Sequence, residues 1–385
     1  MIDARVPHAA ELMSGFVGRT GVTGDGPSRR YLWTDAFAVC NLLGLERATG
    51  DGRWRELALR LVDRVHHVLG RHRPDDARTG WISGLPEPEG ERHPTAGGLR
   101  IGKRLPERGP GEPFDERSEW DRDGQYFHYL TKWMHALDQT TRATGQALFH
   151  RWARELARAA HRGFVVTGSG GRKRMVWKAS IDLSRPLVVS TGQHDPLDGW
   201  VTCLQLGSTL PDAEPPLADV TADFAAMMHP SGLATSDPLG LGGLLVDASR
   251  LHQLLGQGAP PSGAELRDAL LGAALTGLGA YLAQPDLRQP ATRRLAFREL
   301  GLAIGLAAVA PLAREASGFG GRTRAALDGL AKALPLREAI ESFWLEPAHR
   351  ATELWREHAD INDVMLATSL APEGFVVLPR PERAA

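Results

Sequence analysis

Carboxylates gather in three short segments of this 385-residue chain, residues 33–35, 119–123 and 191–200. Each segment stands at or just before an apolar pattern of helical period. When two carboxyl groups lie close together, the protonated one can donate a proton and the ionised one can accept a proton. Carboxylates that the fold brings together could therefore act as acid and base. The candidates are Asp123 and Asp195 as the preferred pair, with Asp35 and Asp198 next.

Each of these carboxylates also has an ordinary structural interpretation. Asp35 could cap the helix that begins beside it. Asp195 stands before Pro196, which fits a helix N-cap followed by proline at the first helical position. Glu119 and Asp121 could be solvated or paired with neighbouring arginines.

Histidines offer a second chemistry, because a neutral imidazole can move a proton near pH 7. Two imidazoles on opposite sides of one carbon could invert that carbon, as in a sugar epimerase or isomerase. His128 and His194 are the candidates, and each could equally be a hydrogen-bonded structural histidine. No helix-spaced ligand set accompanies them, so the sequence predicts neither a metal site nor a cofactor.

Cationic and aromatic side chains near these segments could bind a substrate. Arg100 and Lys103 could hold a carboxylate or phosphate, or could be solvated loop charges. Tryptophan faces can stack on sugar rings or fill the core, and five of them stand near the polar segments: Trp33, Trp81, Trp120, Trp177 and Trp200. The predicted substrate-binding residues are Trp33, Trp120, Trp200, Tyr126, Gln193, Arg100, Lys103 and His93.

Helical periodicity covers most of the chain and supplies the elements that must position these residues. Two joins are alike: RATGDGRWREL at Arg47 and RATGQALFHRW at Arg142 each lead from a mostly apolar helix into an amphipathic one. We predict about twelve helices in alternating inner and outer roles. Besides the one after the second join, they cover residues 4–16, 31–49, 53–69, 119–145, 197–206, 213–228, 237–256, 264–282, 289–312, 322–334, 338–358 and 361–369.

Strand signals are confined to two regions. The loop of residues 72–117 is rich in Gly, Pro and charge, and its stretches GWISGL and GGLRIGK could pair as a small hairpin. Residues 163–180 favour two short strands around a Gly-rich turn. Loops of such length in a compact domain are often functional.

Composition limits the classes of function. The formal net charge is -1, with 45 Lys+Arg against 46 Asp+Glu, so nucleic acid is not an expected partner. Cys40 and Cys203 are the two cysteines and are expected to be buried thiols. The N-terminus does not have a secretory pattern, and the apolar segment near residues 302–312 is too short to span a bilayer. We therefore expect a cytoplasmic protein without a membrane partner.

The stretch YLWTDAFAVCNLLGLERATGDGRWRELA from Tyr31, with the second RATG join, resembles the six-hairpin glycosidase-like superfamily, whose fold is an (α/α)6 toroid. Trp33-Thr34-Asp35 before an apolar helix and ATGD is similar to the first hairpin of unsaturated glucuronyl hydrolases. EWDRDGQYFHYL resembles the W-D motifs of trehalase-like inverting glycosidases. ATGD joins also occur in the sugar 2-epimerases of the superfamily. The resemblance implies a single all-α domain over residues 1–385, an (α/α)6 toroid of about six helical hairpins. The 72–117 insertion, or a small β-hairpin, would cover a pocket at one end of the inner helices.

Two departures separate this chain from those families. Glucuronyl hydrolases carry an Asp a few turns before their second ATG-type join, where this chain has Phe127, His128 and Tyr129. Sugar epimerases carry paired histidines on late inner helices, and the late helices here are poor in His. Neither catalytic set transfers to this sequence.

These patterns together predict a carbohydrate-active enzyme, a glycoside hydrolase with an acid–base carboxylate pair acting on a sugar or uronic-acid substrate. The resemblance implies the wider carboxyl separation of inverting enzymes. The alternatives are a sugar epimerase or isomerase with paired histidines, and a non-catalytic toroid that binds a ligand. The expected partner is a small-molecule or oligosaccharide substrate. Substrate, linkage, stereochemical outcome and oligomeric state are left open.

Overall fold

Two helical pairs with the same join show how the sequence builds the structure. The computed structural model describes residues 4–24, 28–168, 170–210, 213–229 and 232–380. Helix α2 (Leu32–Thr49) leads to α3 (Arg53–Leu69), and α6 (Phe127–Thr144) leads to α7 (Ala147–Phe164). The turn glycines Gly50 and Gly145 have φ values of 71° and 70°, a left-handed conformation that glycine adopts readily. The predicted repeat of the RATG join is confirmed.

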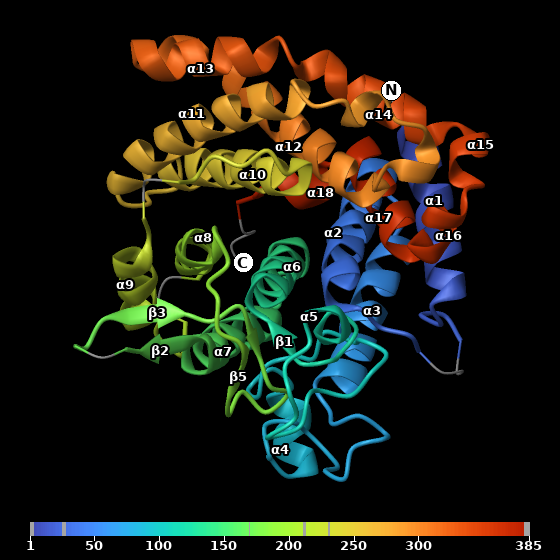
Figure 1. Ribbon diagram of the computed structural model, residues 1–385, viewed down its shortest axis with the longest axis vertical. Coiled ribbons are helices and arrows are strands. Elements are labelled where there is room, and N and C mark those ends of the chain that lie inside the picture. Colours follow the sequence, from blue (N-terminus) through green and yellow to red (C-terminus); the bar gives the residue numbers. More distant parts are fainter. Residues whose placement is uncertain (1–3, 25–27, 169, 211–212, 230–231, 381–385) are drawn as a thin grey trace. The chain divides into compact units, whose positions relative to one another are not determined.

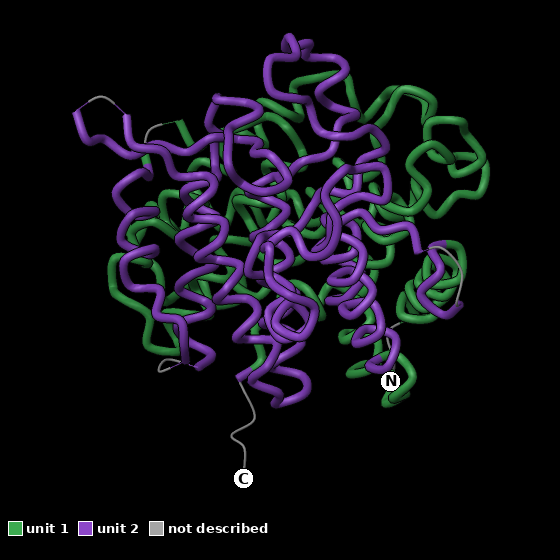
Figure 2. The backbone as a smooth tube through the Cα atoms, turned by 90° about the horizontal axis from the view of Figure 1, so that it is seen from below, with its two compact units in different colours: residues 1–19, 41–54, 229–379 green, residues 20–40, 55–228, 380–385 purple. Residues whose placement is uncertain are grey.

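The chain divides into two compact units (Figure 2): residues 1–19, 41–54 and 229–379, and residues 20–40, 55–228 and 380–385. We call them unit 1 and unit 2. A single domain over residues 1–385 stays a prediction. Unit 2 contains every residue of the predicted site.

Unit 2 is built from helices with a few short strands (Figure 1). Strands β1, β4 and β5 form an antiparallel sheet in the order β1-β4-β5, and β2 pairs with β3 as the hairpin predicted within residues 163–180. Helix α6 packs against both α7 and α8. Besides α6, α7 and parts of α2 and α3, the elements are α4 (Glu87–Arg92), α5 (Glu116–Glu119), β1 (Gln125–Tyr126), β2 (Val165–Thr167), β3 (Lys173–Met175), β4 (Lys178–Ala179), β5 (Pro186–Val188), α8 (Asp195–Thr209) and α9 (Ala218–Met227).

Unit 1 is helical throughout its described elements, and α10, α11 and α12 pack side by side (Figure 1). Its elements are α1 (Val6–Arg19), α10 (Pro238–Leu255), α11 (Ser262–Leu282), η1 (Asp286–Arg288), η2 (Ala291–Arg293), α12 (Ala296–Arg314), η3 (Ala316–Gly318), α13 (Gly321–Ala331), α14 (Leu334–Leu345), α15 (Pro347–Arg350), α16 (Glu353–Glu357), α17 (Ala359–Leu370) and α18 (Glu373–Val376).

The apolar segment near residues 302–312, predicted to be too short to span a bilayer, lies in the longer helix α12. Among the described residues, α12 is the one helix whose length and composition would allow it to cross a membrane. Within unit 1 it packs against α10, α14 and α17, and 72% of its most apolar window is buried. Packing in a helical core accounts for this apolarity.

The crossing of α10 and α12 depends on glycine. A Cβ atom on Gly242 would lie 2.0 Å from the carbonyl oxygen of Gly301, and one on Gly305 would lie 2.6 Å from the Gly242 Cα. We expect Gly242→Ala to lower the free energy of unfolding by about 3 kcal/mol, because the two backbones must separate. Urea denaturation measures this change.

Gly243 is the matched control on the same helix. A Cβ atom there would meet nothing within 4 Å in the described structure. Gly243→Ala should therefore be neutral or stabilising by up to about 1 kcal/mol, since alanine favours the helix. Equal effects of the two substitutions would contradict the close backbone approach.

Several predicted elements are wrong in detail, and the helices expected over residues 213–228 and 289–312 begin only at Ala218 and Ala296. The helix expected over residues 119–145 begins only at Phe127, because the acidic segment before it pairs with the neighbouring loop instead. Residues 338–358 are broken into α14, α15 and α16, with Pro347 opening α15. GWISGL and GGLRIGK do not pair with each other: Ile82 donates to the Gly70 carbonyl, and Ile101 donates to that of Gly124.

Candidate functional site

The first turn of helix α8 carries two carboxylates, Asp195 and Asp198. Side chains three residues apart on a helix are neighbours, and each residue is only 5% exposed. The helix begins at Asp195, with His194 as its N-cap residue. Gly192 makes room for the first carboxylate, because a Cβ atom there would lie 2.3 Å from Asp195 Oδ2. The local sequence therefore places two acids side by side at a helix start.

These two carboxylates stand in opposite electrostatic surroundings. Asp198 Oδ2 accepts hydrogen bonds from Lys132 Nζ at 2.7 Å and from Thr131 Oγ1, so an ammonium balances its charge. Asp195 Oδ2 is buried and has no hydrogen-bond partner in the part of the chain that the structure describes. Burial, aided by the Asp198 carboxylate, raises the pKa of Asp195 to about 7. One acid of the pair can therefore hold a proton near neutral pH beside an ion-paired partner.

His128 lies in the first turn of α6, close to this pair. Burial and the Lys132 ammonium lower the pKa of His128 to about 4, although the Asp198 carboxylate partly offsets this by raising the pKa. The imidazole is therefore neutral at physiological pH. Its ring stacks on Tyr126 with a centroid separation of 5.5 Å and meets Tyr129 edge-on at 4.8 Å.

Aromatic rings continue from His128 as a connected row. Trp177 contacts Tyr126 at a centroid distance of 4.8 Å and Trp120 at 5.1 Å. At the other end the hydroxyls of Tyr31 and Tyr129 are 2.6 Å apart. We call this set the aromatic row: Trp120, Trp177, Tyr126, His128, Tyr129 and Tyr31. It contains three of the four tyrosines of the chain, and Trp120 at its outer end is 49% exposed.

Buried charge pairs hold the row in place. Lys178 on β4 donates from Nζ to Glu119 Oε1 at 2.9 Å and to the Arg122 carbonyl at 2.8 Å. The same Nζ lies 5.4 Å from the centre of the Tyr126 ring. Glu119 also accepts from Arg108 Nε at 2.9 Å. The acidic segment before α6 thus supports the aromatic row.

Asp123 is fully buried, and the protein itself occupies both carboxylate oxygens. Oδ2 accepts from Arg100 Nη1 at 2.6 Å and from Arg73 Nη1 at 3.3 Å. Oδ1 accepts from the backbone N–H groups of Gly102 at 3.0 Å and Lys103 at 3.3 Å. A carboxylate held by two guanidiniums and backbone donors organises a loop and has little capacity left for a substrate.

Asp35 has a similar structural environment. Its Oδ2 accepts from the backbone N–H of Tyr31 at 3.0 Å, and its Oδ1 lies 3.2 Å from Arg30 Nη1. Because Asp35 is 1% exposed, these contacts fix the start of α2. Its role is to position Tyr31 at the end of the aromatic row.

The remaining candidate residues are dispersed. Trp33 and Trp200 are buried core residues, and Arg100 is committed to Asp123 and to the carbonyls of Arg71 and Val68. His93 Nδ1 pairs with Glu155 Oε1 at 2.7 Å, on the side of the unit formed by α4 and α7. Gln193 and His194 lie in the segment that enters α8. Of the predicted residues, the structure brings together Asp195, Asp198, His128, Tyr126 and Trp120, with Lys103 beside Tyr31 at the other end of the row.

Several residues of the site were not predicted from the sequence, among them Tyr31, Tyr129, Thr131 and Lys132. The last two had a usable signal: polar side chains one turn after His128 on an inner helix. Such residues need a polar partner when the helix is packed on several sides. The partner is Asp198 on the neighbouring helix α8.

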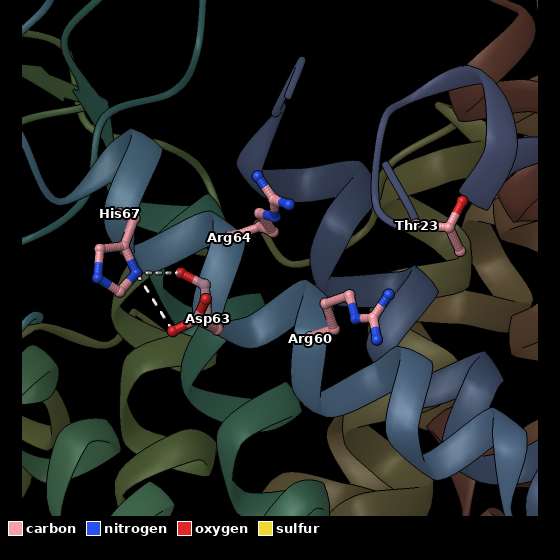
Figure 3. Close-up of a pocket in the computed structure, with 5 residues that line it drawn as sticks. All are labelled: Thr23, Arg60, Asp63, Arg64 and His67. Carbon is pink, nitrogen blue, oxygen red and sulfur yellow. Dashed lines mark hydrogen bonds and ion pairs between the residues drawn. The ribbon is translucent and has the colours of Figure 1, made fainter. Parts of the chain in front are cut away.

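A surface cavity of about 470 Å³ lies on the outer side of α3, lined by Thr23, Arg60, Asp63, Arg64 and His67 (Figure 3). His67 Nδ1 pairs there with Asp63 Oδ1 at 3.2 Å. None of the predicted site residues lines this cavity. The carboxylate pair and the aromatic row, which combine titratable and ring-binding groups, are therefore the stronger candidate site.

Among the described residues, no group of three or more His, Cys, Asp or Glu side chains is arranged to hold a metal ion.

Comparison with known proteins identifies the fold. No family model and no curated protein matches the sequence. Among solved structures, an α-1,6-mannanase of glycoside hydrolase family 76 from Salegentibacter sp. HEL1_6 is 11% identical, with 96% of this chain and 99% of that chain covered and a TM-score of 0.55.

Two enzymes of other activities are also similar. A D-mannose isomerase is 11% identical, with 87% of this chain and 84% of that chain covered and a TM-score of 0.51. The cellobiose 2-epimerase from Spirochaeta thermophila is 10% identical over 96% of this chain and 98% of that chain, with a TM-score of 0.50. These enzymes share the six-hairpin architecture that the sequence predicted. The chain therefore has the all-α, six-hairpin (α/α)6 toroid fold.

Proposed function

We propose that this protein is a carbohydrate-active enzyme that cleaves a glycosidic bond, with Asp195 as the general acid and Asp198 as its ionised partner. The observation that carries the proposal is the contrast between the two acids on one helical turn. Asp195 is buried, and its Oδ2 accepts no hydrogen bond from any residue that the structure describes, whereas Asp198 is paired with Lys132. Two carboxyl groups with such different surroundings are what glycoside hydrolysis requires.

In the proposed reaction Asp195 gives its proton to the leaving-group oxygen as the bond between that oxygen and the anomeric carbon breaks. Asp198 attacks the anomeric carbon as that bond breaks and forms a glycosyl-enzyme. The ionised Asp195 then takes a proton from the water that displaces Asp198 from the sugar. Cβ atoms three residues apart on a helix are about 5–6 Å apart, close to the roughly 5–5.5 Å carboxyl separation of retaining enzymes. We therefore propose retention of configuration in place of the inversion that the resemblance implied.

The aromatic row supports a sugar as the substrate. The more exposed rings Trp120 and Trp177 offer flat apolar faces to the C–H patches of a sugar ring. The similar folds of the mannanase, the isomerase and the epimerase support the same substrate class, although fold alone does not determine function.

The two acids proposed here are three residues apart, unlike the consecutive aspartates substituted in variants of the similar mannanase. Variants of that enzyme described as inactive carry substitutions at two consecutive aspartates, and they were studied with α-1,6-mannotriose or α-1,6-mannotetrose. In this chain the consecutive pair is Asp75-Asp76, in a loop where Arg73 and Arg78 engage the carboxylates. Asp195 and Asp198 therefore remain the proposed pair.

Neutral His128 favours a second candidate, a sugar isomerase or epimerase. Its unprotonated imidazole is half-buried close to Asp198 and Lys132, and a neutral imidazole can accept a proton from a carbon beside a carbonyl. In this reaction a sugar would exchange its C2 proton with solvent.

One assay distinguishes the two reactions. The protein is incubated in D2O with α-1,6-manno-oligosaccharides, free mannose and a panel of aryl α- and β-glycosides that includes uronides, and products are followed by proton NMR. The proposed hydrolase releases a reducing sugar with its original anomeric configuration and leaves C2 protonated. Deuterium at C2 without bond cleavage supports the isomerase instead. Absence of both reactions across the panel counts against either enzyme.

A further inference from the structure

Lys103 places an ammonium at the Tyr31 end of the aromatic row, and among the described residues this ammonium has no ion-pair partner. Its Nζ lies 5.5 Å from the centre of the Tyr31 ring, on a half-buried side chain. Within the described ranges, Nζ has no hydrogen bond and no ion pair. Half-buried charges normally have a partner, because desolvation is costly.

The backbone around Lys103 is fixed from both sides. Its N–H donates to Asp123 Oδ1 at 3.3 Å, and its carbonyl accepts from Arg73 Nη1 at 2.7 Å. These contacts hold the residue beside the row without using its ammonium. The buried ion pairs around Asp123 thus serve to present Lys103.

The charges that face Lys103 do not neutralise it. Asp123 is engaged by two arginines, and Lys178 is paired with Glu119. Asp121 lies on the exposed side of its segment. Burial lowers the pKa of Lys103, with Asp121 acting in the opposite direction. The charge on Lys103 is therefore available to a ligand.

We infer that Lys103 binds a carboxylate of an acidic sugar whose ring lies on the aromatic row. The inference rests on the proposed function and adds the class of substrate, a uronic acid unit. A single ammonium balances one negative charge, whereas a phosphate dianion would leave excess charge against aromatic rings. Lys103 would select the substrate, while Asp195 and Asp198 act on the bond.

Binding to a catalytically inactive variant tests this inference separately from turnover. The Asp195→Asn protein is titrated by calorimetry with pairs of methyl glycosides that differ only at C6, one with a carboxylate and one with a hydroxymethyl group. We expect the uronate of at least one pair to bind 10–100-fold more tightly than its neutral partner, which is the usual range for a hydrogen bond to a charged group. Sugar 6-phosphates form a third arm.

Substitutions at Lys103 complete the test. Lys103→Met should remove the preference for the uronate while leaving neutral-sugar affinity within twofold, and Lys103→Arg should keep much of it. Arg104→Met, at the adjacent exposed position, is the matched control and should change nothing. Circular dichroism melting confirms that each variant is folded.

Three results would overturn the inference: equal affinity for acid and neutral sugars, a preference that survives Lys103→Met, or tighter binding of the 6-phosphates than of the uronates. Loss of turnover in Asp195→Asn with no uronate preference would leave the hydrolase proposal standing and remove this one. A uronate preference in a protein that cleaves no glycoside would support binding by Lys103 and would remove the hydrolase proposal.

Discussion

Asp195→Asn is expected to lower kcat/KM for glycoside cleavage by about 10²–10⁴-fold, the range for loss of a general acid. Asparagine has nearly the volume of a protonated carboxyl group and no charge, so the start of α8 should keep its structure. The side chain, however, has no proton acidic enough to reach the leaving group. The loss should be smallest for substrates with 4-nitrophenol as leaving group, because that phenolate departs without protonation.

The pH dependence of kcat/KM should also reflect the role of Asp195 as an acid. Asp195 acts as an acid only while protonated, and its pKa is raised to about 7. Wild-type kcat/KM should therefore fall as the pH rises through about 7. In Asp198→Asn, which should also lose turnover, the pKa of Asp195 itself should be lower, because the neighbouring carboxylate is one cause of the raised pKa. A wild-type kcat/KM that does not fall as the pH rises through about 7 would contradict the role assigned to Asp195.

Asp123→Asn has a different expected effect, a loss of about 3–5 kcal/mol of folding free energy. The substitution removes the carboxylate that neutralises Arg100, a residue only 5% exposed. A buried guanidinium without its partner is costly, and the backbone donors of Gly102 and Lys103 lose their acceptor as well. Chemical denaturation followed by tryptophan fluorescence measures the change.

Asp121→Asn is the matched control for that experiment. Asp121 is two residues earlier in the same segment and is exposed, so its substitution should change stability by no more than about 0.5 kcal/mol. If Asp123→Asn instead keeps full stability and loses turnover, Asp123 belongs to the catalytic machinery, as the sequence first suggested.

The architecture could be predicted from the sequence because helices and the turns between them are determined by nearby residues. Amphipathic periodicity and the two RATG joins marked the first helical pairs, and the turn glycines Gly50 and Gly145 adopt the conformation that such joins require. The resemblance at residues 31–58 then extended these pairs to the six-hairpin fold.

The site could be predicted from the sequence only in part, because the burial and ion pairing of each side chain depend on residues far apart in the chain. Asp123 and Asp195 are equally plausible as acids in the sequence. The structure separates them: Asp123 meets Arg100 and Arg73 from the preceding loop, whereas Asp195 meets no donor at Oδ2 among the described residues. Lys132 could be assigned only after α6 and α8 were seen to pack together.

The most direct test of the roles assigned to Asp195 and Asp198 is a titration of the aspartate carboxyl carbons by NMR in protein labelled with ¹³C-aspartate. One carboxyl resonance is expected to titrate near pH 7, to vanish in Asp195→Asn and to titrate at lower pH in Asp198→Asn. If every aspartate resonance titrates below about pH 5, Asp195 cannot store the proton that the proposed reaction requires.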